Sequence, residues 1–193
     1  MHAEDRPDSA FQEPVLELLD DLEMQAGGLH LADRALEVEG LSEAQLAEVD
    51  LIARLHASTG CALHVATVDG HDVHGVLAGV GSDWLILAED AGTSAVVPLR
   101  YVVLVAGLGG RAVPVEARPV STRLSLRSVL RRLGEDGEVC AVHLRGGRVL
   151  HGSLRGVGAD FVELRGEQAA EVLTIPLTAV AVVRSRSAAD GRP

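Results

Sequence analysis

Residues 73–87 read VHGVLAGVGSDWLIL, and residues 150–164 read LHGSLRGVGADFVEL. Both stretches carry His-Gly and Gly-Val-Gly at the same spacing, which indicates an internal repeat. Two copies at this separation are too few and too far apart for a solenoid. The repeat therefore predicts two similar structural units in this chain of 193 residues.

The sequence around each copy alternates between apolar and polar residues, as half-buried strands do. Asp69-Gly70 and Gly146-Gly147 interrupt the alternation and predict tight hairpin turns. We expect five short strands per copy, which must curl into a small closed barrel to bury one face and limit exposed edges. Tight curvature requires residues without a Cβ, and the repeated glycines supply them: Gly75, Gly79, Gly81, Gly152, Gly156 and Gly158.

Helices are expected ahead of both sets of strands. Apolar residues recur at helical spacing within 14–40, over 42–60 with Ser42 as N-cap, and over 121–133. The predicted fold class is mainly β with N-terminal helices: two small five-stranded bent-sheet barrels, each preceded by a helix. The predicted boundaries are an acidic tail and helical segment (1–41), a first barrel (42–107), a Gly/Pro-rich linker (108–120), a second barrel (121–185) and a disordered tail (186–193).

The net charge of −11 is unevenly distributed. Residues 1–50 contain 14 acidic residues and two arginines, whereas residues 51–193 are close to neutral. The expected helix over 121–133 carries four arginines: Arg123, Arg127, Arg131 and Arg132. Three interpretations of these side chains remain open, namely contacts to nucleic-acid phosphates, docking of the acidic N-terminal segment, and a solvated helix face.

The sequence also disfavours several function classes. Because it has no long apolar run and no signal-peptide pattern at its start, we expect a cytoplasmic protein that binds no membrane. Cys61 and Cys140 suit small core residues of a reduced protein. No nucleophile-elbow, phosphate-loop or dinucleotide motif is present, and no cysteine at useful spacing completes a zinc site with His64, His71 and His74. We therefore expect no catalysis, no cofactor and no metal.

The order of these features resembles the Sm/LSm family: a helix, a V-x-V-x-x-(D/G)-G hairpin, a bent x-x-G-x-L strand, a turn and a final P-L-x-x-V-x-x-V stretch. Residues 126–164 are most similar to the bacterial Hfq branch, and the C-terminal barrel of the ribosome-maturation protein RimP has similar signals. The resemblance implies Sm-like barrels, which generally form rings of six or seven subunits by pairing the fourth strand of one subunit with the fifth of the next. Three copies of a two-barrel chain would close such a ring; two barrels packed on each other are the alternative.

The resemblance also implies positions for RNA contacts. Hfq binds RNA through a Lys-His pair before its fifth strand, and through a Tyr, hairpin residues and a Gln on the opposite face. This chain has histidines and arginines at several of these positions, and both side chains stack on bases and donate to them. The implied RNA-binding candidates are His143, Arg148, His151, His71, His74 and Arg100. Solvated outward positions on alternating strands are the alternative interpretation.

The function implied by the resemblance is a non-catalytic, Sm- or Hfq-like regulator that binds single-stranded RNA and can assemble as a ring. The alternative is a protein-interaction or assembly module without nucleic-acid binding, in which barrel edges and the acidic N-terminal helices bind protein. The sequence has no lysine and only four aromatic residues, and this composition favours the alternative. A DNA-binding regulator is a weaker third hypothesis, because no helix-turn-helix pattern stands out.

Overall fold

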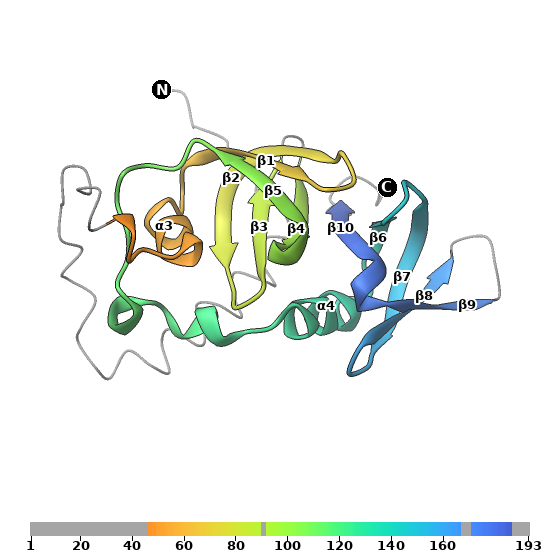
Figure 1. The fold of residues 1–193 in the computed structure, drawn as a ribbon. Coiled ribbons are helices and arrows are strands. Elements are labelled where there is room, and N and C mark those ends of the chain that lie inside the picture. Colours follow the sequence, from red (N-terminus) through yellow and green to blue (C-terminus); the bar gives the residue numbers. More distant parts are fainter. Residues whose placement is uncertain (1–45, 90–91, 167–170, 187–193) are drawn as a thin grey trace, which may run out of the picture.

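The computed structural model of the chain describes residues 46–89, 92–166 and 171–186 (Figure 1). The expected acidic tail and helical segment (1–41), the expected N-cap Ser42 and nearly all of the expected disordered tail lie outside these residues.

Each copy of the repeat forms one helix and five strands, and we call the copies the first unit (residues 51–106) and the second unit (residues 126–186). The first unit contains α3 (Leu51–Ala57), β1 (Ala62–Thr67), β2 (Asp72–Val80), β3 (Trp84–Ala88), β4 (Thr93–Pro98) and β5 (Val102–Ala106). The second unit contains α4 (Leu126–Glu135), β6 (Val139–Leu144), β7 (Val149–Val157), β8 (Phe161–Gly166), β9 (Val172–Pro176) and β10 (Val180–Arg186). Short 3₁₀ turns lie at Leu99–Tyr101, Val115–Ala117, Val120–Arg123 and Leu177–Ala179.

The ten strands of the described residues form a single sheet in the order β5-β1-β2-β3-β4-β10-β6-β7-β8-β9. The expectation of a mainly β protein is confirmed, but the prediction of two separate barrels, each preceded by a helix, is wrong. The physical reason lies at the turn 99–101, which redirects the chain so that β5 pairs with β1 and not with β4. The free edge of β4 therefore pairs with β10 of the second unit. These backbone hydrogen bonds join the two units, and neither unit closes into a barrel of its own.

The bend glycines act as the sequence indicated, by allowing close approach of two strands. A Cβ on Gly75 would lie 2.2 Å from the carbonyl oxygen of Ala88, and a Cβ on Gly152 would lie 2.1 Å from that of Arg165. Beyond each glycine the pairing with the third strand carries a register shift. The glycines thus bend β2 and β7 over their neighbours without closing either unit.

Both helices begin later than the sequence pattern indicates. The N-cap of α3 is Asp50, whose carboxylate accepts a hydrogen bond from the backbone nitrogen of Ala53 at 2.6 Å. Arg118 donates to both carboxylate oxygens of Asp50 at 2.9 Å, so the segment between the units is tied to the start of α3. The second helix begins at Leu126, because residues 120–123 form a 3₁₀ turn first.

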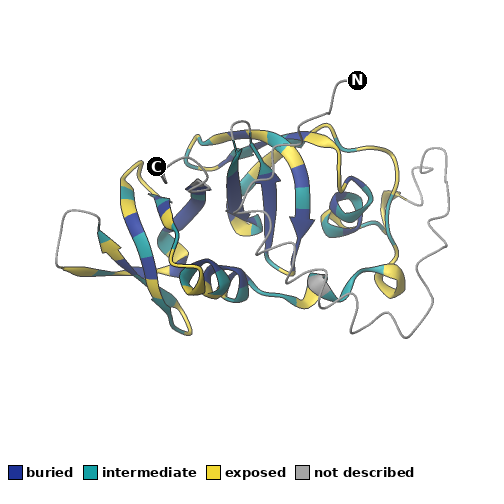
Figure 2. Ribbon diagram, turned by 180° about the vertical axis from the view of Figure 1, so that it is seen from behind, coloured by how far each residue is buried: buried dark blue, intermediate teal, exposed yellow. Residues whose placement is uncertain are grey.

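Two hydrophobic cores lie along the sheet, and each includes residues from both units. Val182 of β10 packs in the core of the first unit, together with Leu55, Leu77 and other residues of that unit. Trp84, Ile86 and Val96 of the first unit pack in the core of the second unit beside α4. Figure 2 shows the buried residues concentrated on the sheet and on the inner side of α4. The units are consequently not independent in their packing.

Candidate functional site

The ladder between β4 and β10 joins the two units at the middle of the sheet. It pairs Val96 with Val183, and it continues to Thr93 opposite Arg186. Val96 and Val183 are buried in the second core, while Val97 and Val182 point to the first core. We call this ladder and its flanking contacts the junction. Burial on both faces makes it a structural connection and leaves its backbone inaccessible to a ligand.

The helix of the second unit is held by the turn that precedes β3 of the first unit. The Asp83 carboxylate accepts a hydrogen bond from the backbone nitrogen of Leu126 at 2.7 Å. The indole nitrogen of Trp84 donates to the carbonyl oxygen of Leu124 at 2.9 Å, and the Trp84 side chain is fully buried. The local sequence gives no sign that Asp83 and Trp84 would hold the other unit.

A polar cluster forms the flank of the junction. Arg184 of β10 donates to both carboxylate oxygens of Glu89 at 2.9 and 3.1 Å, and also to the Nε2 atom of His143 at 3.3 Å. The ring of His71 approaches that of His143 edge-on at 5.0 Å. Sequence reasoning missed Arg184 and Glu89, because their partners lie far away along the chain. The cluster is an ion pair with two imidazoles packed beside it.

The imidazole of His143 is neutral at pH 7. Burial of the ring, with added repulsion from Arg184, His71 and His151, lowers the pKa of His143 from 6.5 to about 4. A neutral ring leaves Nε2 able to accept the hydrogen bond from Arg184. His143 was a candidate for stacking on a base, but the structure places it half-buried against the junction.

The six RNA-binding candidates do not form one surface. Arg100 donates to the carbonyl oxygen of Leu177 and lies over the ring of Tyr101, at 4.7 Å from its centre, so its charge is used between the units. His74 stacks on His64, with ring centres 4.1 Å apart. Three of the other candidates lie near one another at the flank of the junction, because His71 approaches the ring of His143 and His151 is close enough to act electrostatically on it. Arg148 is exposed.

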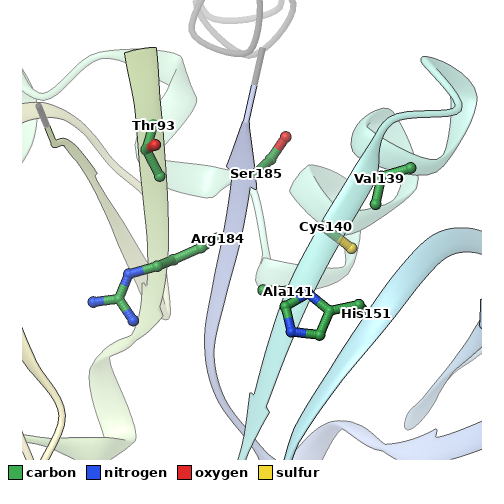
Figure 3. Close-up of a pocket in the computed structure, with 7 residues that line it drawn as sticks. All are labelled: Thr93, Val139, Cys140, Ala141, His151, Arg184 and Ser185. Atoms are coloured by element: carbon green, nitrogen blue, oxygen red, sulfur yellow. The ribbon is translucent and has the colours of Figure 1, made fainter. Parts of the chain in front are cut away.

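An open hollow of about 440 Å³ lies beside the junction (Figure 3). It is lined by Thr93, Val139, Cys140, Ala141, His151, Arg184 and Ser185. The thiol of Cys140 donates to the carbonyl oxygen of Gly152 at 3.3 Å, and burial raises the pKa of this thiol to about 12. The guanidinium of Arg184 points away from His151 and toward β4. At pH 7 the Cys140 thiol is therefore protonated and not a reactive thiolate.

The arginines of α4 and of the 3₁₀ turn before it are largely in solvent. Arg123, Arg127 and Arg131 are exposed, and Arg132 forms a long ion pair with Glu135 at 3.7 Å. A second hollow of about 280 Å³ lies where α4 meets β7, and Arg131 and Arg155 both line it. Arg155 was not singled out from the sequence.

The end strands of the sheet carry exposed apolar side chains. On β5, Val103 is 63% exposed and Leu104 is 48% exposed. Their counterparts in the repeat are Ala181 and Val182 of β10, and both are fully buried in the junction. At the other end of the sheet, Val172 of β9 is 39% exposed. β5 and β9 correspond in the repeat to β10 and β4, the strands that pair at the junction. In the sheet, β5 and β9 are the end strands, so one edge of each has no neighbouring strand.

The remaining expectations concern metals, membranes and cysteines. Among the described residues, no group of three or more His, Cys, Asp or Glu side chains is placed to hold a metal. No helix in that part of the chain has the length and apolarity needed to cross a membrane. Both cysteines are free; Cys140 is buried as expected, but Cys61 is exposed and not a core residue.

The sequence was compared with protein-family models and with curated proteins, and it matches none of them.

Proposed function

We propose that the chain is a non-catalytic assembly module, in which β9 of one copy pairs with β5 of the next. The observation that carries the proposal is the internal ladder between β4 and β10. In the repeat, β4 corresponds to β9 and β5 to β10. One chain therefore already contains the contact once, and it presents both halves of the same contact at its two ends.

The internal register predicts the register between copies. In the repeat, Thr174 corresponds to Val96 and Val105 corresponds to Val183. Because Val96 and Val183 are paired within the chain, we expect Thr174 of one copy to lie opposite Val105 of the next. The same correspondence places Leu104, now 48% exposed, at the position of the fully buried Val182. Pairing would thus cover the apolar edge of β5. An exposed, flat, apolar edge strand otherwise promotes uncontrolled aggregation.

A contact of this kind is heterologous, because two different edges meet. Repetition of a heterologous contact gives a closed ring if its rotation closes, and an open filament if it does not. Light scattering at increasing protein concentration distinguishes the two: a ring reaches one fixed mass, whereas a filament continues to grow. A monomer at every concentration would contradict the proposal.

A cross-linking experiment tests the strand pairing directly. Two variants, Val105→Cys and Thr174→Cys, are prepared in a Cys61→Ser background that removes the exposed thiol. Mixing the two under oxidising conditions should give a disulfide-linked dimer, because directly opposite residues come within disulfide range. The mixture of Val105→Cys with Val172→Cys is two residues out of register and should give much less dimer. Dimers from Val105→Cys alone would indicate β5 pairing with β5 and overturn the proposed arrangement.

Binding of single-stranded RNA is the second candidate function, and the hollow that Arg131 and Arg155 share favours it. Two arginines beside one hollow, with Arg127 exposed on the same helix, can contact successive phosphates. Arg148 and His151 are exposed sequence candidates for contacts to bases, and no hydrogen bond or ring contact of either side chain is described. Loss of the separate barrels removes the fold argument for RNA binding, so this candidate depends on these side chains alone.

The RNA candidate is tested with labelled A-rich and U-rich RNA over a series of salt concentrations. Removing one phosphate contact with Arg131→Ala should weaken binding and reduce the slope of log K against log salt by about 0.7. Arg148→Ala and His151→Ala test the base contacts. If the acidic N-terminal segment competes for the same arginines, deletion of residues 1–40 raises the affinity. Absence of binding at low salt would eliminate this candidate.

Neither candidate function requires a cofactor or a metal. We place the protein in the cytoplasm, and the two free cysteines support this location.

A further inference from the structure

The outer face of the third and fourth strands differs in polarity between the two units. In the first unit, β3 and β4 pair Ile86 with Val96, and both side chains are fully buried beside α4. In the second unit, the corresponding pair is Glu163 with Thr174. Thr174 is exposed and Glu163 is half-buried. An apolar pair is thus replaced by a polar pair at the face that would meet the next copy.

In the first unit this face joins the hydrophobic core that includes α4, so the corresponding face of the second unit would meet the core of the next copy that includes α3. Leu51 of α3 corresponds to Val129 of α4; Val129 is fully buried, whereas Leu51 is 44% exposed. The contact between copies therefore keeps an apolar residue on α3. It also places the carboxylate of Glu163 where the internal contact has the aliphatic side chain of Ile86.

Glu163 occupies the middle of this face. A Cβ on Gly156 would lie 3.3 Å from the Oε2 atom of Glu163, so the carboxylate lies against the bend of β7. Covering a carboxylate is costly unless a cationic side chain pairs with it. Charged residues on the inward face of an edge are one way in which proteins limit strand-to-strand association.

We propose that Glu163 sets the strength of association between copies, keeping the intermolecular contact weak and reversible while the equivalent internal junction is permanent. This inference rests on the proposed assembly function and adds a regulatory residue to it. The exposed apolar edge of β5 supplies the attraction. The carboxylate of Glu163 opposes the burial that completes the contact.

The test replaces Glu163 and Thr174 of the second unit by Ile and Val, the residues at the corresponding positions of the first unit. Glu163→Ile and the double variant Glu163→Ile with Thr174→Val should associate more tightly than the natural chain, by at least about tenfold in Kd. Glu163→Gln, which removes the charge and keeps the shape, should give an intermediate Kd. Glu116→Ile is the matched control, because it replaces an exposed carboxylate by the same apolar residue between the units, and it should not change the Kd.

Sedimentation velocity over a concentration series gives the Kd, and disulfide trapping between Val105→Cys and Thr174→Cys reports the place of contact. If the natural chain cross-links in register but neither Glu163→Ile nor Glu163→Gln tightens association, the role of Glu163 is wrong and the assembly function stands. If Glu116→Ile tightens association as much as Glu163→Ile does, added hydrophobicity explains the effect and the inference is also wrong. If no variant cross-links or associates, both proposals fail.

Discussion

Asp83 caps a helix that belongs to the other unit: its Oδ1 atom accepts a hydrogen bond from the backbone nitrogen of Leu126 at 2.7 Å. The residue that directly precedes α4 is Ser125, and its side chain makes no capping bond. The first turn of a helix leaves backbone N–H groups without partners, so a cap is needed there. In this protein the cap also fixes where α4 lies relative to the first unit.

Replacing Asp83 by Ala should lower the free energy of unfolding by about 1 kcal/mol, which is typical for loss of an N-cap. Urea denaturation followed by circular dichroism measures the change. Asp160 is the matched control, because it holds the equivalent turn position in the second unit and is exposed. Asp160→Ala should change the stability by less than about 0.5 kcal/mol. Equal losses in the two variants would show that Asp83 acts only within its own turn.

The equivalent aromatic residues Trp84 and Phe161 should differ strongly in their contribution to stability. Trp84 is fully buried and donates to the carbonyl oxygen of Leu124, whereas Phe161 is half-buried. Trp84→Ala should lower the free energy of unfolding by about 3–5 kcal/mol, because it leaves a large cavity between the units. Phe161→Ala should lower it clearly less. Denaturation curves with similar midpoints for the two variants would contradict a role of Trp84 in holding the units together.

Stability should decrease as the pH is lowered from about 6.5 toward 4. Burial lowers the pKa of His143 and of His56 from 6.5 to about 4, with added repulsion from Arg184 and from Arg118, respectively. Between these pH values the unfolded chain binds protons that the folded chain does not bind, so acid favours unfolding. Thermal unfolding from pH 7.5 to 4 should show a falling Tm. Part of the fall should be absent in His143→Gln, and more of it in the double variant His56→Gln with His143→Gln; an unchanged pH dependence in the double variant would refute this assignment.

Gly152→Ala should destabilise the second unit, because the new Cβ would lie 2.1 Å from the carbonyl oxygen of Arg165. The strands must separate locally, and we expect a loss of about 1–3 kcal/mol or more in the free energy of unfolding. Gly109→Ala is the matched control, since no atom lies within 4 Å of its added Cβ. Amide hydrogen exchange should show faster exchange in β7 and β8 for Gly152→Ala. Normal protection there would mean that the strands accommodate the methyl group.

Local elements were predictable because their causes are local. Gly146 and Gly147 form the expected turn with φ of +83° and +86°, and the alternating residues before them form β6 (Val139–Leu144). Alternation of period two, turn residues and missing Cβ atoms act between neighbours in the chain. The candidate site was less predictable. Arg100 and His143 were candidates for contacts to RNA. In the structure, Arg100 donates to the carbonyl oxygen of Leu177, and Arg184 donates to His143; these partners are distant in the sequence.

Two similar units, their strands and the glycines at which the strands bend could be predicted, because the same pattern occurs in both halves of the described chain. The pairing of β4 with β10, the capping of α4 by Asp83 and the position of β5 and β9 at the ends of the sheet follow from the three-dimensional fold. The physical reason is that a strand edge offers the same backbone donors and acceptors to any partner. Which partner it receives depends on where turns such as 99–101 direct the chain and on which faces become buried together.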